Sequence, residues 1–299
     1  MTILGCGAAA PTPYFLTTSQ LVNIHNQLIL IDCGEGTQLT LRQINARFQK
    51  IKIILISHMH ADHTMGIPGL IASMNLLGRK TPLEIHGPAE LEEFVKKVWY
   101  LTGTHIEFEV NFKINSSKEI KCIYECNTFE IHSFPTKHRV PTCGFRIAEK
   151  AGAYSLKPHS KNNFKLNHLE IQKLKKGEDL VRAEGVTPNS KLCTPPKDAR
   201  SYAFAADSAF SPKVVKAVKE VNLLYHEATF ESKDSGIAKK TEHSTASDAG
   251  RVALEAQVDK LILGHFSNRY RVLKTLLTEA QEVFENSCLA EERKTYLIG

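Results

Sequence analysis

The stretch Ile51–His63, which reads IKIILISHMHADH, is the most informative part of the sequence. Ile51 to Ser57 is an apolar run rich in β-branched residues, which is typical of a strand buried on both faces. Three histidines and one aspartate follow directly, at positions 58, 60, 62 and 63. We therefore expect a buried strand that delivers the chain to a cluster of polar side chains beginning at His58.

The His-x-His-x-Asp-His pattern has the composition of a metal site. Imidazole nitrogens and carboxylate oxygens are ligands that zinc accepts at neutral pH. Four candidate ligands exceed what one tetrahedral ion needs if one position stays open for water, so the spacing indicates two ions. His58 and His60 can point to one side as the chain leaves the strand, while a turn at Ala61 brings Asp62 and His63 to the other. The alternative is a set of surface histidines.

Two adjacent ions need further ligands, and three candidates stand at the ends of predicted strands. His138 follows the segment Phe129–Phe134, Asp207 ends the strand Tyr202–Ala206, and His265 follows Leu261–Leu263. Their alternative roles are a surface histidine, a helix cap and a buried core histidine, respectively. Together with the first cluster they predict a complete metal site. A carboxylate at Asp207 would bridge both ions and hold them roughly 3.5 Å apart.

A metal pair of this kind indicates hydrolysis. Such a pair lowers the pKa of a shared water, supplies hydroxide at neutral pH and clamps the oxygens of a phosphodiester during in-line attack. Redox chemistry is disfavoured because the pattern includes no soft thiolate ligand.

Composition and charge narrow the class of protein. The chain has 299 residues with 38 Lys and Arg against 32 Asp and Glu, a formal net charge of +6, which favours anionic partners only weakly. Its apolar runs are far shorter than the ~20 residues that cross a bilayer, so we expect no membrane segment. The opening MTILGCGAAAPTP does not read as a secretion signal. Seven scattered cysteines favour reduced thiols and a cytoplasmic location.

Periodicity predicts a mixed α/β chain. The other expected strands are Thr2–Leu4, Ser19–Asn23, Gln27–Asp32, Asn222–His226 and Lys260–Leu263, with more strands between Glu107 and Pro135. The expected helices are Thr37–Ile44, Ile67–Leu77, Ala89–Leu101, Pro212–Val221, Thr245–Gln257 and Arg269–Phe284.

The chain shows no clean linker, so we expect one catalytic domain over residues 1–299. Its composition changes at Lys150–Lys176, a stretch rich in Lys, Asn and His and poor in periodic apolar residues. We interpret residues 150–180 as an insertion or arm. Its Lys173, Lys175 and Lys176 would make salt-dependent phosphate contacts, or alternatively form an ordinary solvated face.

Several motifs together resemble the metallo-β-lactamase superfamily and, within it, the ribonuclease Z family of transfer-RNA 3′-processing endonucleases. They are LGCGAAAPTP, IDCGEGTQ, SHMHADHTMGIPGL, AADS, HEATF with EHST, and GHFSNRY, and they span most of the chain. The histidine cluster is shared by many hydrolases, whereas HEATF with EHST and HFSNRY are much narrower signals.

The resemblance implies a four-layer αββα sandwich with a di-zinc site at one edge. By that resemblance His58, His60 and His138 match the ligands of one zinc ion, and Asp62, His63 and His265 match those of the other, with Asp207 bridging. Asp62 also matches the proposed general base.

The same resemblance suggests an acid for the leaving oxygen. His243 matches the histidine that protonates the leaving oxygen, and Glu227 matches the carboxylate that orients this histidine. A general acid is useful here because an alkoxide is a poor leaving group. The alternatives are a surface histidine beside a helix cap and a structural salt bridge.

Two further groups are candidates around the metal site. Asp32 in IDCGEG would accept a proton from a metal-bound histidine, or alternatively cap a turn. Ser267, Asn268, Arg269 and Tyr270 are expected to begin a helix beside His265, where backbone amides and Arg269 would hold a phosphate.

The leading hypothesis is a zinc-dependent endoribonuclease that cuts precursor transfer RNA beside the discriminator base, acting as a homodimer. By the same resemblance, residues 150–180 are an inserted substrate-binding arm, shortened in this chain. The arm departs from the family pattern because it keeps LKKGEDL but lacks a Gly-Pro motif. Ala206 and Ser208 also flank Asp207 where Gly and Thr are usual. The rival hypotheses are another hydrolase of this fold, such as a small-molecule phosphodiesterase, arylsulfatase or lactonase, and an RNA-binding protein with a vestigial site.

Overall fold

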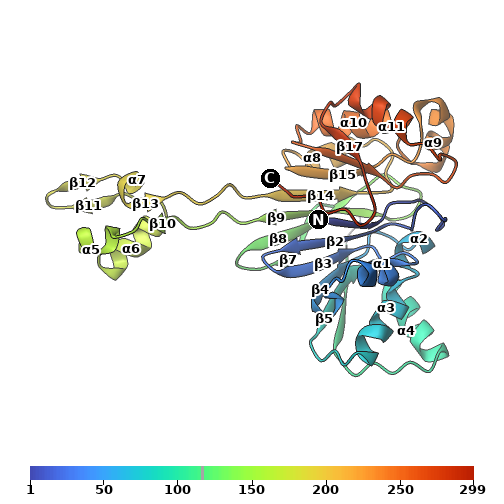
Figure 1. Ribbon diagram of the computed structural model, residues 1–299, viewed down its shortest axis with the longest axis horizontal. Helices are drawn as coiled ribbons and strands as arrows, with labels where there is room; N and C mark the ends of the chain where they lie inside the picture. The colour runs from blue at the N-terminus through green and yellow to red at the C-terminus, as the bar shows by residue number, and fades with distance from the viewer. Residues whose placement is uncertain (116–117) are drawn as a thin grey trace. The chain divides into compact units, whose positions relative to one another are not determined.

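Figure 1 shows a computed structural model of the chain, which describes residues 1–115 and 118–299. The chain divides into two compact units. The main unit comprises residues 1–125, 131–147 and 201–299, and the arm unit comprises residues 126–130 and 148–200. The segment expected as the arm, residues 150–180, lies within the arm unit, which continues to Arg200.

The first sheet of the main unit has six strands in the order β1-β2-β3-β4-β5-β6. They are β1 (Thr2–Gly5), β2 (Ser19–Ile24), β3 (Gln27–Ile31), β4 (Ile51–Leu55), β5 (Leu83–Gly87) and β6 (Val110–Ile114). Strands β1 to β3 pair antiparallel, whereas β3 to β6 pair parallel. The carboxyl ends of these parallel strands share one edge, where α/β proteins build their sites.

The second sheet has seven strands in the order β17-β16-β15-β14-β9-β8-β7. They are β7 (Lys121–Glu125), β8 (Phe129–Pro135), β9 (Cys143–Glu149), β14 (Ser201–Ala205), β15 (Leu223–Glu227), β16 (Leu261–Gly264) and β17 (Ser287–Leu289). Strands β14 to β17 pair parallel, and Glu227 at the end of β15 is in register with Gly264 of β16. This register brings the residues that follow β14, β15 and β16 to one edge.

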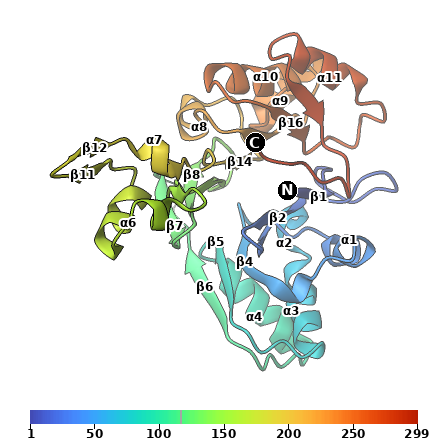
Figure 2. The ribbon, with the colours of Figure 1, turned by 60° about the vertical axis from the view of Figure 1, so that its left-hand side comes forward.

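Helices cover the outer faces of the two sheets. On the first sheet lie α1 (Thr37–Gln43), α3 (Ile67–Leu76) and α4 (Leu91–Leu101), and on the second α8 (Pro212–Ala217), α10 (Ala246–Glu255) and α11 (Lys274–Gln281). Figure 2 shows these two helical layers with the sheets between them. Shorter helices are α2 (Ala61–Thr64) and α9 (Ser235–Thr241), with 3₁₀ turns at Phe48–Lys50 and Ser232–Asp234.

An apolar core joins the first sheet to its helices. Leu41 of α1, Met74 of α3 and Val95 of α4 are buried against Ile54 and Ile85 of the central strands. Burying a side chain of this size contributes about 1.5–3 kcal/mol. No helix among the described residues is both long and apolar enough to span a membrane.

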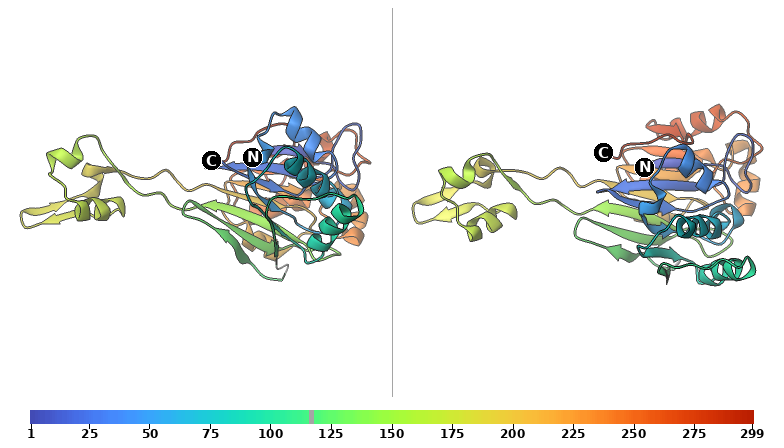
Figure 3. Two further views of the ribbon diagram at one scale, coloured as in Figure 1. Left: turned by 90° about the horizontal axis from the view of Figure 1, so that it is seen from below. Right: turned by 60° about the horizontal axis from the view of Figure 1, so that its bottom comes forward.

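The two ends of the chain lie together in the main unit, as Figure 3 shows. The amino group of Met1 donates a hydrogen bond to the Tyr296 carbonyl at 2.8 Å. The Tyr296 N–H in turn donates to the Met1 carbonyl at 2.7 Å. These bonds tie the C-terminal segment to the residue that precedes β1.

The predicted start of the last helix at Arg269 is wrong, because α11 starts at Lys274. The Tyr270 side chain explains the delay. Its hydroxyl donates to the Asp234 carboxylate and accepts a hydrogen bond from the Glu231 N–H at 3.1 Å. This anchoring holds Tyr270 in a turn, so no helix terminus forms beside His265.

The arm unit has a small core of its own. It contains β10 (Ser155–Leu156), α5 (Ser160–Asn163), α6 (His168–Lys175), β11 (Leu180–Arg182), β12 (Gly185–Thr187), α7 (Asn189–Leu192) and β13 (Cys193–Thr194). Leu166, Leu174, Leu180 and Leu192 are buried together. Because these leucines come from short elements of different types, they show no single period in the sequence.

Candidate metal centre and catalytic site

The residues after β4 supply the first part of the site. Strand β4 ends at Leu55, His58 and His60 follow in extended chain, and Asp62 and His63 lie on the single turn of α2. His58, His60, His138 and Asp207 each offer one ligand atom, and these atoms all lie within 4.8 Å of one another. His58 Nε2 is 3.4 Å and His138 Nε2 is 3.7 Å from Oδ2 of Asp207. This group has the donors and the size of a metal site.

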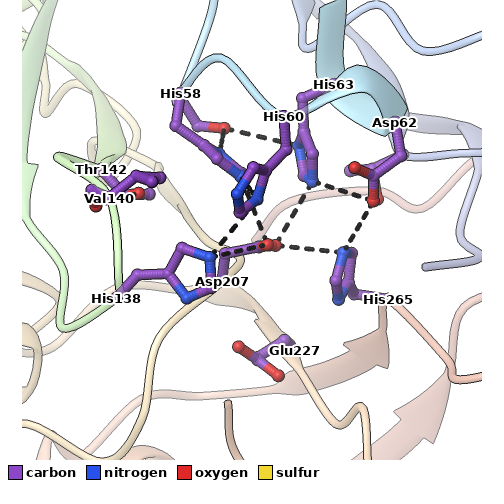
Figure 4. A network of polar contacts seen from close by, with 12 residues as sticks. His58, His60, Asp62, His63, His138, Val140, Thr142, Asp207, Glu227 and His265 are labelled. Atoms are coloured by element: carbon purple, nitrogen blue, oxygen red, sulfur yellow. Dashed lines mark hydrogen bonds and ion pairs between the residues drawn. The ribbon is translucent and has the colours of Figure 1, made fainter. Parts of the chain in front are cut away.

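A second group lies on the other side of Asp207. Asp62, His63 and His265 also offer atoms within 4.8 Å of one another. Oδ1 of Asp207 is 3.4 Å from His63 Nε2 and 3.1 Å from His265 Nε2. The two oxygens of Asp207 thus face different groups, as Figure 4 shows.

Several of these atoms are buried without a partner. Among the described residues, Nε2 of His63, Nε2 of His265 and Oδ1 of Asp207 make no hydrogen bond. Orphaned buried polar atoms cost free energy unless something satisfies them. Their convergence fits metal ions, which would accept the lone pairs of all three atoms.

The backbone is strained where it presents these side chains. Asp32, Asp207 and His265 follow β3, β14 and β16, and their φ angles are 53°, 48° and 55°. Non-glycine residues pay roughly 1–2 kcal/mol for this left-handed conformation. Three such residues at strand ends facing one site indicate strain retained for function.

Asp32 holds His63 from behind. Its Oδ2 accepts hydrogen bonds from Nδ1 of His63 at 2.7 Å and from the Ser57 hydroxyl at 2.8 Å, and its Oδ1 accepts from the Ser57 N–H at 2.8 Å. A hydrogen bond at Nδ1 selects the tautomer whose Nε2 carries a lone pair. Asp32 therefore orients Nε2 of His63 toward Asp62 and Asp207.

The two inner carboxylates are strongly acidic. Burial alone would raise the pKa of Asp62 and of Asp207, but the surrounding histidines outweigh it. The pKa of each falls well below its ordinary value, chiefly through His63 for Asp62 and through His265 and His63 for Asp207. Both side chains are thus carboxylates at neutral pH, the form that binds a cation.

A buried pair, Glu227 and His243, lies beside the two groups. Nδ1 of His243 is 2.9 and 3.1 Å from the two Glu227 oxygens. The Glu227 carboxylate is fully buried and also accepts hydrogen bonds from the N–H groups of Ser208 and Ser244 and from the Thr229 hydroxyl. Burial opposes charge on His243, but the adjacent Glu227 carboxylate outweighs it and raises the pKa of His243 to about 9. His243 is thus held as a proton donor.

A cavity of about 450 Å³ exposes these groups to a ligand. His60, Asp62, Asp207, His243 and His265 line it, together with residues that the sequence analysis did not propose for the site: Ala8, Ala9, Ala61, Arg139, Thr229, Phe230 and Thr241. The position of Arg139, directly after His138, was the available signal for a cation near a phosphate site. The guanidinium of Arg139 adds positive charge to an otherwise acidic cavity.

The candidate substrate-binding residues fall in different places. Ser267 and Asn268 line the cavity. Arg269 does not line the cavity, and its guanidinium carbon lies over the Phe230 ring at 5.6 Å from the ring centroid. Tyr270 is buried against Asp234 and Glu231. The helix end expected beside His265 is wrong, because α11 begins at Lys274, whereas phosphate binding by Ser267 and Asn268 stays a prediction. Lys173, Lys175 and Lys176 belong to the arm unit, at the end of α6.

Comparison with known proteins decides the family. Ribonuclease Z of Parabacteroides distasonis is 40% identical over 291 residues, which cover 97% of this chain and 96% of that protein. Ribonuclease Z of Bacteroides fragilis is 41% identical with the same coverage. The chain belongs to the ribonuclease Z family. The resemblance expected from the HEATF, EHST and HFSNRY motifs is confirmed.

Solved structures support the fold of this ribonuclease Z family chain. Human tRNase Z, short form, superposes with a TM-score of 0.71 at 24% identity, covering 100% of this chain and 98% of that one. YhfI of Bacillus subtilis, a metallo-β-lactamase fold protein, gives a TM-score of 0.69 at 19% identity, again covering 100% and 98%. The expected αββα sandwich is confirmed.

One family model, described as anti-Pycsar protein Apyc1, matches residues 1–163. This range contains the histidine cluster and His138 but ends before Asp207, Glu227, His243 and His265. The match therefore covers the part of the site that many hydrolases share and omits the Glu227–His243 pair. The ribonuclease Z proteins named above match over 97% of the chain.

Proposed function

We propose that this protein is a zinc-dependent endoribonuclease that removes the 3′ trailer of precursor transfer RNA by cutting beside the discriminator base. The observation that carries the proposal is the position of Asp207, with one oxygen toward each group of ligands and the Glu227–His243 pair alongside. The full-length identity to ribonuclease Z proteins supports RNA as the substrate.

We assign one zinc ion to each group. His58, His60 and His138 would hold the first ion, Asp62, His63 and His265 the second, and Asp207 would bridge them. Nitrogen and carboxylate donors without a thiolate suit zinc. When bound, the two ions supply an activated water and positive charge that stabilises the phosphodiester oxygens in the transition state.

Asp62 is the candidate general base. Its Oδ2 accepts a hydrogen bond from the Ala9 N–H at 2.8 Å, so the opening loop LGCGAAAPTP fixes the carboxylate at the cavity wall. A carboxylate with this depressed pKa is ionised at neutral pH, and it orients the attacking water and accepts its proton. Arg139, which lines the same cavity, would neutralise the phosphate that receives the attack.

His243 is the candidate general acid. Glu227 accepts the Nδ1 hydrogen bond, which leaves Nε2 to carry the proton that goes to the reaction. As the phosphorus–oxygen bond breaks, the 3′ oxygen of the discriminator nucleotide takes this proton and becomes a hydroxyl. The trailer then departs with a 5′-phosphate. The oxygen of the attacking water ends on this phosphate, and the proton that the water gives up ends on the general base, Asp62.

The arm unit is the candidate site for the body of the transfer RNA. Lys173 and Lys175 lie exposed on α6 and Lys176 at its end, where they would neutralise backbone phosphates. We further assign the protein to the cytoplasm, where precursor transfer RNA is processed, and expect it to work as a homodimer.

Incubation of the purified protein with a precursor transfer RNA that carries a 3′ trailer tests this function. We expect a single cut beside the discriminator base that disappears when a chelator removes the metal. Zinc should be found at two ions per chain by mass spectrometry. Hydrolysis of a small phosphodiester without any cut in the precursor would instead assign the protein to another branch of the fold.

A further inference from the structure

A second cavity is lined by His60 but not by Asp62, and it has no role in the chemistry described above. Its volume is about 500 Å³, and it is lined mainly by apolar side chains. They are Met59, Pro88, Ala89, Ile114, Val140 and Pro141. His60 lines both this cavity and the catalytic one, so the two cavities meet at a candidate metal ligand.

The cavity contains one unsatisfied amide. Asn115 lines it, and its buried amide nitrogen and oxygen make no well-formed hydrogen bond among the described residues, although the Cys143 thiol and His86 lie within electrostatic reach. The backbone holds Asn115 in place, since its N–H donates to the Gly87 carbonyl at 2.9 Å. A fixed donor and a fixed acceptor therefore lie side by side in an apolar cavity. Leaving both groups without a hydrogen bond costs free energy.

The charge of the lining excludes a phosphate. No lysine or arginine is among its described lining residues, and the one ionised side chain is Glu90 at the exposed edge. A phosphate would meet this carboxylate without a counter-charge. A flat heterocycle is a better match, because apolar walls accept its faces and Asn115 and Glu90 accept or donate at its edge.

We propose that this cavity, defined by Asn115, Met59, Val140 and Pro141, binds the nucleobase of a nucleotide next to the scissile phosphate. The inference rests on the proposed function, because an RNA phosphate at the metal centre puts the neighbouring nucleotide beside His60. Every base presents a donor next to an acceptor on its pairing edge, which the Asn115 amide can match once the base is unstacked. Binding one base here would set the register of the cut.

Precursors that lack one base test the proposal. Two RNAs are made, each with an abasic ribose on one side of the cut, and single-turnover cleavage is measured against the intact RNA. We expect one abasic RNA to be cut at least about tenfold more slowly. Asn115→Ala should slow cleavage of the intact RNA by a similar factor and add no further loss on that abasic RNA. Equal cleavage of all three RNAs by the wild type overturns the proposal. A loss from Asn115→Ala that adds in full to the loss from the abasic RNA also overturns it.

Two further variants guard against a folding defect. Asn111→Ala changes an exposed asparagine of β6, the strand that Asn115 follows, and should cut all RNAs like the wild type. Ala89→Trp adds bulk at the exposed rim and should block the base while leaving the abasic RNA unaffected.

Binding provides a readout that does not need cleavage. Single-stranded RNA with 2-aminopurine beside the cut position is titrated with chelator-treated protein, and we expect its fluorescence to change at least about twofold with the wild type and not with Ala89→Trp. If the intact precursor is not cut at all, the proposed function fails, and this titration still decides whether the cavity takes a base. An equal fluorescence change with both proteins overturns the base site.

Discussion

The Thr229 hydroxyl lies 2.9 Å from Nδ1 of His265 and donates its own hydrogen to the Glu227 carboxylate. It therefore accepts the His265 Nδ1–H and fixes the tautomer whose Nε2 faces Asp62 and Asp207. Glu227 also accepts from His243, so one buried carboxylate orients both the candidate acid and a candidate metal ligand. The threonine of the HEATF motif thus has a physical role that the motif alone does not reveal.

Replacing Thr229 by valine keeps the shape of the side chain and removes the hydroxyl. His265 then loses its partner at Nδ1, and we expect the affinity for metal to fall about 10- to 100-fold. A competition titration with a metal-binding dye measures this loss. Thr229→Ser retains the hydroxyl and should stay close to the wild type, and equal metal affinity in the valine and wild-type proteins would refute the role.

Asp207→Asn removes the charge shared by the two ligand groups at almost constant volume. The buried histidines then face no anion between them, and we expect bound metal and cleavage to be lost together. Metal analysis after dialysis and a cleavage assay on the same sample check this. Asp198→Asn, at an exposed position of the arm unit, is the control and should change neither. Full metal content with no activity would contradict the bridging role.

His243→Ala separates proton transfer from metal binding. His243 belongs to neither of the two groups assigned to zinc, although it also lies within 4.8 Å of ligand atoms of Asp207 and His265. Because its Nδ1 is hydrogen-bonded to Glu227, we assign it to proton transfer and expect the metal content to remain unchanged. Cleavage of the precursor should slow by about 10²- to 10⁴-fold, the range of a general acid. A variant that cuts at the wild-type rate would remove His243 from the reaction.

Substitution of Lys173, Lys175 and Lys176 tests whether the arm unit binds RNA. Neutralising all three should weaken binding of precursor transfer RNA and flatten its dependence on salt by up to about 0.7–0.9 in slope for each lost phosphate contact. Cleavage of a minimal substrate that lacks the transfer-RNA body should stay as it is. Unchanged binding across a salt series would make these lysines an ordinary solvated face.

Much of the fold was predictable because it depends on local periodicity. The apolar run that ends before His58 forms β4, and the expected strands at residues 2, 19 and 27 all begin where β1, β2 and β3 begin. The start of α11 was not predictable, since Tyr270 is held by Asp234 and Glu231, which lie far away in the sequence. The core of the arm unit was not predictable for a related reason, because its leucines come from separate short elements.

The residues of the site were predictable from their chemistry, whereas their grouping followed only from the resemblance to ribonuclease Z. Ligand chemistry and strand ends pointed to His138, Asp207 and His265, but only the fold brings them within reach of His58 and His63. The role of Asn115 depends on which strands share an edge, and nothing in its local sequence distinguishes it from a surface residue. Long-range proximity of this kind has no signature in a single sequence.

Cleavage of the precursor in water enriched in ¹⁸O, with mass analysis of both product ends, is the most direct test of the reaction proposed for this site. Attack by water with departure of the 3′ oxygen predicts one ¹⁸O in the 5′-phosphate of the trailer and an unlabelled 3′-hydroxyl on the transfer RNA. A 2′,3′-cyclic phosphate on the transfer RNA, or label at its 3′ end, would contradict the mechanism and the assignment of Asp62 and His243.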